Sequence, residues 1–250
     1  MLRALKPVIF LFGVLGTLVI LALGFLCMAS GPTFTYRYRL TIEVDTPHGP
    51  KSGSSVIETT LQNNHEVKWA PPEARKFTAR ARGEAVFVDL GDDRHVIGLL
   101  AMGPTAKDDP EFRKIVPDAL AVRWDTPNET IPAIVAAVAR GGGIDVPAKS
   151  IPTLITFHAL SNPDSAQVVP SDDFVGVFGP GYAFRRATVE LVPVGVWPLN
   201  LVGLTGVPLS YSIDRKLPAI LEILRERNKR PSVHHWRDPY RPASGHLVVK

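Results

Sequence analysis

The residues with the clearest capacity for acid–base chemistry are one histidine and two neighbouring aspartates. His158 follows the apolar segment Ile151 to Phe157, which predicts a short buried strand, and catalytic side chains are often held at strand ends. Asp172 and Asp173 have the chemistry of a general acid and base, but two aspartates at a helix start more simply act as capping residues. Because no nucleophile pairs with His158, we assign no catalytic residue and keep these three as the candidates.

Sequence motifs for bound phosphates, dinucleotides, zinc and calcium are incomplete in this chain. The nearest approach is Gly143 to Ser150, where Lys149 and Ser150 stand at phosphate-loop spacing. Pro147 removes a backbone donor there, and an extended segment from Ile151 follows where a helix would have to begin. We therefore predict a helix end followed by a loop, with no cofactor and no metal ion.

The most distinctive element of the sequence is an uncharged N-terminal run. Pro7 to Ser30 predicts a transmembrane helix, because about 24 residues at about 1.5 Å each give about 36 Å, and a hydrocarbon core is about 30 Å thick. The alternatives are a cleaved signal peptide and a buried core helix. The apolar run is longer than the roughly 7–15 residues of a signal peptide, and Ala29 to Gly31 makes a poor cleavage site, so we favour an uncleaved anchor.

Orientation follows from length more than from charge. Arg3 and Lys6 before the anchor are nearly balanced by Arg37 and Arg39 after it. A short N-terminal tail stays in the cytoplasm easily, whereas a long C-terminal domain can be exported whatever its charge. We therefore expect a single-pass membrane protein, with residues 1–6 in the cytoplasm and the body on the outer side of the cytoplasmic membrane.

Composition excludes several classes of function for the body. Of 28 Lys and Arg, two precede the anchor, which leaves 26 against 24 Asp and Glu, so we expect no nucleic-acid partner. Cys27 is the one cysteine in the chain, and it lies inside the anchor. Thiolate zinc sites and cysteine nucleophiles are therefore excluded from the body.

Hydrophobic periodicity predicts an α+β body that is rich in antiparallel strands. Phe34 to Asp45 alternates between apolar and polar residues, which is the pattern of a long strand with one wet face. Turn residues and a Val/Ile/Thr-rich run predict its hairpin partner at Ser54 to Leu61. Further strands are expected at three places, a second hairpin of 84–90 with 95–101, then 151–157, then 183–192.

Two or three short helices complete the predicted fold. Ile131 to Arg140 has an apolar stripe and many alanines, so we expect a well-buried helix. Ser171 is expected to cap a helical turn that Gly179 ends, and Pro218 to Lys229 predicts an amphipathic helix. We expect one folded domain over residues 31–230, followed by a tail at 231–250 that is either disordered or extended over the body.

A second uncharged run, Leu191 to Ile213, needs a separate decision. As a transmembrane helix it would lose backbone bonds at Pro193, Pro198 and Pro208, which lipid cannot replace. We therefore predict an extended, proline-kinked segment packed on the core and keep a second span as the alternative.

Several segments together resemble an uncharacterised family of bacterial single-pass or exported envelope proteins. They are 53–58, 84–91, 172–182 and 216–218. The resemblance covers most of residues 34–220 and implies an envelope setting, but it carries no activity and no site residues. The apolar insertion from Trp197 to Thr205 departs from the family pattern.

These observations favour a non-enzymatic, membrane-anchored envelope protein that acts as a binding or structural module. Its expected partners are the lipid bilayer, through Pro7 to Ser30, and other envelope proteins. Only Ser30 to Thr33 separate the anchor from the first strand, so the body stays near the lipid surface. The alternative is a membrane-attached hydrolase or small-ligand sensor with a cleft near His158.

Overall fold

The computed structural model of the 250-residue chain describes residues 31–65, 67, 71–103, 113–196, 199, 204–229 and 248–249. The predicted anchor, Pro7 to Ser30, and nearly all of the tail after 230 lie outside these residues. In the part that is described, no helix is both long and apolar enough to cross a bilayer. Contacts divide the chain into two compact units, Met1–Phe34 with Leu61–Thr78, and Thr35–Thr60 with Ala79–Lys250.

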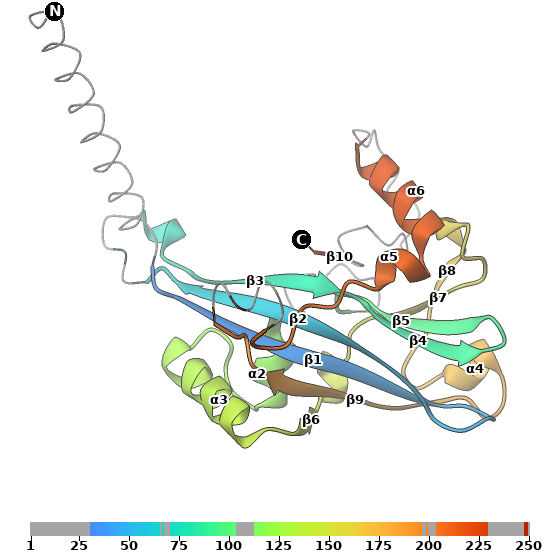
Figure 1. The fold of residues 1–250 in the computed structure, drawn as a ribbon, viewed down its shortest axis with the longest axis horizontal. Coiled ribbons are helices and arrows are strands. Elements are labelled where there is room, and N and C mark those ends of the chain that lie inside the picture. Colours follow the sequence, from blue (N-terminus) through green and yellow to red (C-terminus); the bar gives the residue numbers. More distant parts are fainter. Residues whose placement is uncertain are drawn as a thin grey trace, which may run out of the picture. The chain divides into compact units, whose positions relative to one another are not determined.

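Long antiparallel strands make the larger sheet, with the order β10-β3-β2-β1-β9-β6 (Figure 1). Its strands are β1 (Thr33–Asp45), β2 (Lys51–Asn63), β3 (Phe77–Glu84), β6 (Gly143–Asp145), β9 (Ala183–Val192) and β10 (Val248–Val249). β9 pairs with β1 so that Val189 lies opposite Leu40. The first strand, its hairpin partner and the strand at 183–192 are confirmed. In the tail, β10 pairs with β3 in extended form.

A second antiparallel sheet has the order β4-β5-β7-β8. Its strands are β4 (Val86–Gly91), β5 (Arg94–Gly98), β7 (Leu154–Phe157) and β8 (Ala166–Val168). The predicted second hairpin is confirmed, since β4 and β5 are joined by a tight turn at Asp92 and Asp93, both at positive φ. Aspartate tolerates that conformation better than most residues because its short side chain bonds locally.

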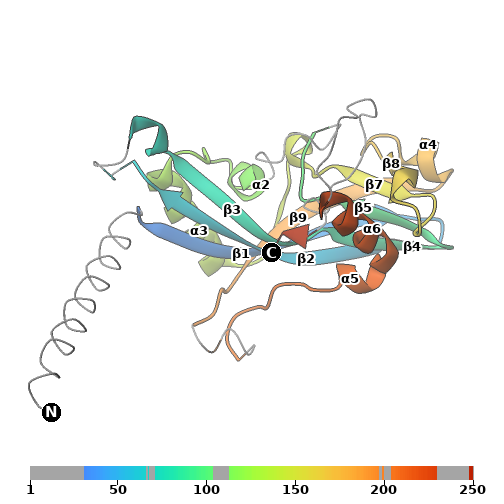
Figure 2. The same ribbon diagram turned by 90° about the horizontal axis from the view of Figure 1, so that it is seen from above.

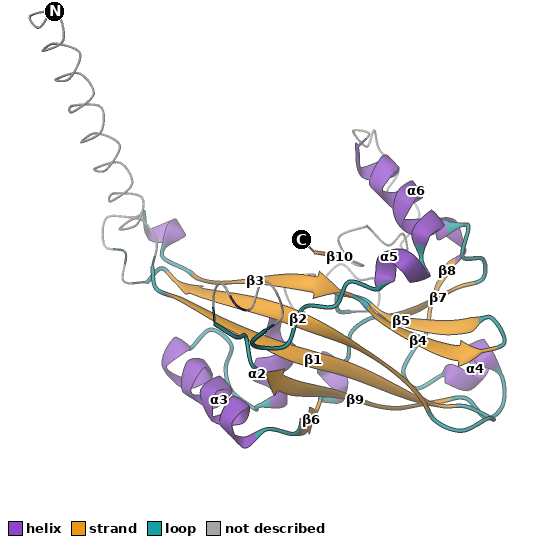
Figure 3. Ribbon diagram, in the orientation of Figure 1, coloured by secondary structure: helices purple, strands orange, loops and turns teal. Residues whose placement is uncertain are grey.

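Five α-helices and three short 3₁₀ turns are described, and with the two sheets they confirm a strand-rich α+β fold (Figure 3). The helices are α2 (Ile115–Ala119), α3 (Pro127–Arg140), α4 (Phe174–Phe178), α5 (Ile213–Lys216) and α6 (Pro218–Lys229), and the turns are η1 (Pro72–Ala74), η3 (Ala148–Ser150) and η4 (Pro163–Ser165). The helix from Pro218 is confirmed at both ends. It packs with α5 on the second sheet, where Leu217, Ile220 and Leu221 are buried.

Two helix predictions are wrong in detail. α3 is not well buried, because only Thr130, Ile134 and Ala137 are inaccessible and Val135 is 52% exposed. The cap of α4 is Asp173 and not Ser171, since the Asp173 carboxylate accepts a 2.9 Å bond from the Gly176 amide. Aspartate and serine cap equally well, so sequence alone does not choose between them.

We call the apolar run after β9, residues 193–212, the apolar loop; the structure describes its residues 193–196, 199 and 204–212. Figure 2 shows its described ends on one side of the β1 and β2 strands, whereas α2 lies on the other side. The predicted packing of this run on the core is wrong for Val196, Leu199 and Leu204, whose exposed fractions are 65%, 44% and 73%.

The smaller unit is held by backbone bonds at the entry to the long hairpin. The Asn63 amide donates to the Pro32 carbonyl at 3.0 Å, and the Gly31 amide donates to the Asn64 side-chain oxygen at 3.1 Å. The Asn64 amide donates to the Lys76 carbonyl at 3.3 Å. These bonds fix the chain where it enters β1.

Candidate ligand-binding groove

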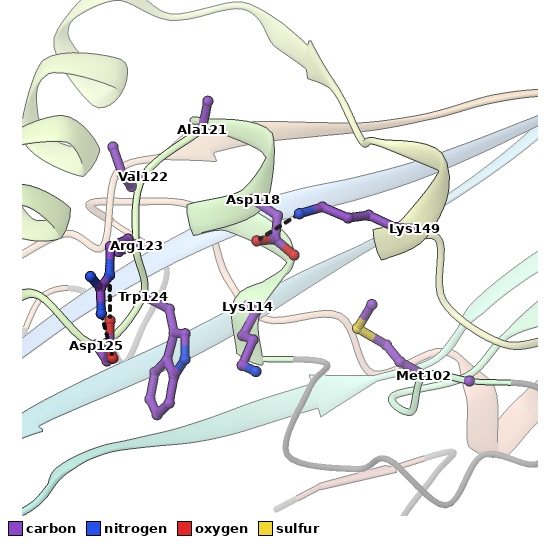
Figure 4. A pocket seen from close by; sticks show the side chains of 10 residues that line it. Met102, Lys114, Asp118, Ala121, Val122, Arg123, Trp124, Asp125 and Lys149 are labelled. Atoms are coloured by element: carbon purple, nitrogen blue, oxygen red, sulfur yellow. Dashed lines mark hydrogen bonds and ion pairs between the residues drawn. The ribbon is translucent and has the colours of Figure 1, made fainter.

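A groove of about 880 Å³ lies beside α2 (Figure 4). α2 is on the side of the β1 and β2 strands opposite to the described ends of the apolar loop (Figure 2). Its wall carries three cationic side chains, two carboxylates and one indole, namely Lys114, Arg123, Lys149, Asp118, Asp125 and Trp124. Most of them belong to the single stretch 114–125, which enters and leaves α2. Lys149 reaches the groove from η3.

The indole and one ammonium group lie together. Lys114 Nζ is 5.5 Å from the centre of the Trp124 ring, which is a cation–π distance. α2 is held beneath them by Ile115 and Val116, which are fully buried. Core packing of this short helix therefore determines where Lys114 and Trp124 stand.

Asp118 is held in place by two residues of η3. The Ser150 hydroxyl donates to Asp118 Oδ2 at 2.6 Å, and Lys149 Nζ lies 4.0 Å from Oδ1. Ser150 is fully buried, whereas the Lys149 side chain is 76% exposed. The serine is therefore a structural anchor for the carboxylate, and the lysine keeps most of its hydration while facing the groove.

Arg123 and Asp125 form an exposed ion pair at the rim, with 3.3 Å between Nη2 and Oδ2. Hydrogen bonding from Arg123 holds the pKa of Asp125 below its usual value, so this carboxylate is ionised at neutral pH. The Arg123 carbonyl accepts a short bond from the buried Thr130 hydroxyl. That bond ties the rim of the groove to the first turn of α3.

A second cavity, of about 230 Å³, adjoins the groove and shares Gly103 and Lys149 with it. Its walls come mainly from residues 151–154 and 168–171, at the ends of β7 and β8. Lys149 thus stands between the two hollows, and a bound molecule in either could reach its ammonium group.

The candidates proposed from sequence lie elsewhere. His158 is exposed after β7, and its amide donates to the Ser165 carbonyl at 3.2 Å. Asp173 caps α4, and Asp172 is exposed beside it. None of the three lines the groove or the adjoining cavity. Across the described residues, no three His, Cys, Asp or Glu side chains gather closely enough to hold a metal ion.

A different histidine occupies the core. His95 is buried between Phe87 and Phe157, with ring centres 5.4 and 6.3 Å away, and its Nε2 accepts a 3.2 Å bond from the Phe157 amide. Burial lowers its pKa, although a bond to the backbone of Asp93 and the charge of Asp89 act in the opposite direction. Its close contacts are with two core phenylalanine rings and with backbone groups, so we assign it a packing role.

The groove was not predicted, because most of its residues fall in the interval 103–128, for which the sequence predicted no helix or strand. The interval 103–128 contains four prolines and one glycine, and α2 is too short to show a helical period. The available signal was the cluster Val122-Arg123-Trp124-Asp125, a large aromatic residue between opposite charges. Gly143 to Ser150, predicted as a loop, contains the short strand β6 at Gly143–Asp145 and η3 at Ala148–Ser150, and extended chain follows at Ile151.

Comparison with protein-family models, with curated proteins and with solved structures gives no match for this chain. The resemblance to envelope proteins stays a prediction.

Proposed function

We propose that this chain is a single-pass protein of the bacterial inner membrane whose periplasmic body binds an anionic ligand in the groove beside α2. The membrane setting is supported by the uncharged run from Pro7 to Ser30 behind Arg3 and Lys6. The short link to the first strand keeps the body close to the lipid surface.

The observation that carries the binding role is the arrangement of the groove wall. Three cations face two carboxylates, so the groove has a positive excess, and Trp124 adds a flat aromatic surface beside the Lys114 ammonium. Recognition sites for small molecules commonly combine an apolar surface with a few fixed polar groups. A carboxylate or phosphate placed between Lys114 and Lys149 would gain charge-assisted bonds, and an attached apolar part would cover the indole.

The hydrolase alternative gains no support from the groove. Among the described residues, its wall has neither histidine nor cysteine, and the Ser150 hydroxyl behind it is directed to Asp118. A nucleophile needs an adjacent base and access to substrate, and Ser150 is fully buried. Binding is therefore the function that this geometry favours.

The test is a fluorescence titration of the detergent-purified full chain with citrate and with inorganic pyrophosphate, against maltose as the neutral probe. We expect at least one anion to change the emission of Trp124 with saturation, and maltose to have no effect. Trp124→Phe should abolish the change, and Lys114→Gln with Lys149→Gln should weaken apparent affinity by about tenfold or more. Arg140→Gln, at the exposed end of α3, is the matched control. A response that both lysine substitutions leave unaltered would contradict the proposed site.

A further inference from the structure

Exposed apolar side chains are concentrated in the apolar loop. The chain from Leu191 to Ile213 has no charged residue, and Val196, Leu199 and Leu204 stand 44–73% exposed. Tyr211, near the end of the loop, is 68% exposed. Single exposed apolar residues are ordinary on a protein surface, but several within one uncharged loop are typical of an interaction site.

Hydrogen bonds join the two ends of the apolar loop. The Val207 amide donates to the Pro193 carbonyl at 2.9 Å, and the Thr205 hydroxyl bonds the Val196 amide at 2.9 Å. Gly206 stands at φ +75°, and a Cβ there would lie 2.5 Å from the Gly195 nitrogen, so the two arms meet too closely for a larger residue. The two ends of the loop are therefore fixed against each other by their own hydrogen bonds, while Val196, Leu199 and Leu204 are exposed.

Hydrogen bonds with β1 and β2 hold the C-terminal part of the loop, residues 204–212. Arg37, which is nearly buried, donates to the Val207 carbonyl at 2.9 Å and is itself paired with Glu58 at 2.8 Å. The Ser210 hydroxyl accepts a 2.9 Å bond from the Val56 amide.

The C-terminal end of the loop is bound by a buried carboxylate. Glu84 is 3% exposed, and it accepts bonds of 2.7 to 2.9 Å from the Ser212 amide, the Ser212 hydroxyl and the Ile213 amide. Such a buried and fully bonded charge fixes geometry strongly, because removing one partner leaves the others without compensation.

Two exposed arginines lie on β3, which neighbours β2 in the sheet. Arg80 and Arg82 are both exposed on β3, and alternate residues of a strand share a face. Their face is the one that bears Glu84, which lies two residues further on. Arg82 lies 3.9 Å from Glu58, the partner of Arg37, so these cations stand beside the point where the loop is attached.

We propose that the apolar loop is a membrane-docking loop, which inserts Val196, Leu199 and Leu204 into the lipid surface while Arg80 and Arg82 face anionic head groups. Apolar side chains that project beyond a basic surface match the two layers of a bilayer interface. A second copy of the chain would present the same arginines and be repelled, so charge complementarity favours lipid. The proposal rests on the membrane setting proposed above and does not depend on the groove.

The experiment uses the full chain in a Cys27→Ser background, with a single new cysteine that carries an environment-sensitive nitrobenzoxadiazole dye. One variant is Leu204→Cys. The matched control is Val135→Cys on α3, which is likewise apolar and exposed. Each is reconstituted into vesicles of phosphatidylethanolamine and phosphatidylglycerol, with and without doxyl-labelled lipid as a quencher. Flotation of the vesicles separately reports whether the chain is anchored at all.

We expect the dye at position 204 to shift to shorter wavelength and to be quenched by doxyl lipid at least twofold more than the dye at position 135. Arg80→Gln with Arg82→Gln should reduce that quenching severalfold in anionic vesicles and little in phosphatidylcholine. Flotation with equal, water-like emission at both positions would overturn the loop proposal and leave the anchor intact. Failure to float would overturn both. A shift at 204 that depends on protein concentration and not on doxyl lipid would assign the loop to contact between copies.

Discussion

At the scale of the residue, His95 shows how burial converts a titratable side chain into a structural one. Its ring is stacked between two phenylalanines, and its Nε2 accepts a bond from the Phe157 amide. That bond requires an unprotonated Nε2, and burial also disfavours the charged ring. The folded protein therefore holds the imidazole neutral at a pH where the unfolded chain would protonate it.

This gives a pH dependence of definite sign. Because the folded-state pKa of His95 lies below the ordinary value of 6.5, its contribution to stability is complete above pH 6.5 and is lost as pH falls below it. The slope is at most about 1.4 kcal/mol per pH unit, until the folded-state pKa is reached. Urea unfolding of the full chain in detergent at pH 5 to 8 should show this slope.

His95→Gln should remove that part of the slope, and His158→Gln, at an exposed histidine, should keep it. Equal slopes for wild type and His95→Gln would show that other groups account for the pH dependence.

Single residues were also where sequence reasoning succeeded least. His158, Asp172 and Asp173 attracted attention because of their chemistry, yet the groove is built from Lys114, Trp124 and other residues that match no catalytic motif. Their proximity depends on how α2 packs and on where η3 returns, and both are long-range facts. Asp118 and Ser150 meet across 32 positions of the chain, and no local pattern encodes such a contact.

At the scale of the element, the strands were predictable because each carries its own signal. β9 and α6 have the predicted bounds, since an alternating pattern and an N-terminal proline are local features. Whether a helix is buried depends on distant parts of the chain, which local sequence does not show. α3 carries alanines and valines on most sides, but only one narrow face meets the sheet, so its predicted burial was wrong.

The contact between the two sheets depends on a glycine. A Cβ at Gly98 of β5 would lie 2.4 Å from the Cδ1 atom of Ile42 in β1, and both residues are fully buried. Gly98→Ala should therefore reduce the free energy of unfolding by about 1–3 kcal/mol through overpacking. Ile42→Val removes the clashing atom and alone should cost about 0.5–1.5 kcal/mol.

The double variant gives the decisive measurement for this contact. Gly98→Ala with Ile42→Val should be more stable than the sum of the single effects by about 0.5–3 kcal/mol, in urea titrations of the full chain. Gly143→Ala is the control, because its new Cβ would lie 3.7 Å from Thr188, an ordinary contact, and should change stability little. Strict additivity would place the strain of Gly98→Ala somewhere other than Ile42.

At the scale of the whole molecule, the two proposed surfaces form one consistent arrangement. The helix α2, beside which the groove lies, and the described ends of the apolar loop are on opposite sides of the β1 and β2 strands (Figure 2). If the loop docks on lipid, the groove is turned away from the bilayer and is open to ligands in the periplasm. The loop would also limit rotation of the body about its short link, since one anchor alone leaves a domain free to turn.

The proposed topology predicts which positions are accessible from the periplasm. In a Cys27→Ser background, Val135→Cys should react with a membrane-impermeant maleimide in cells whose outer membrane alone is permeabilised. Val135 is 52% exposed on α3, so its accessibility needs no unfolding. Ala4→Cys, before the anchor, should react only after the inner membrane is lysed, because a short N-terminal tail stays in the cytoplasm. The reverse labelling pattern would place the body and its groove in the cytoplasm, where a periplasmic ligand could not reach them. Recovery of a chain that lacks its first thirty residues would establish a cleaved signal in place of an anchor.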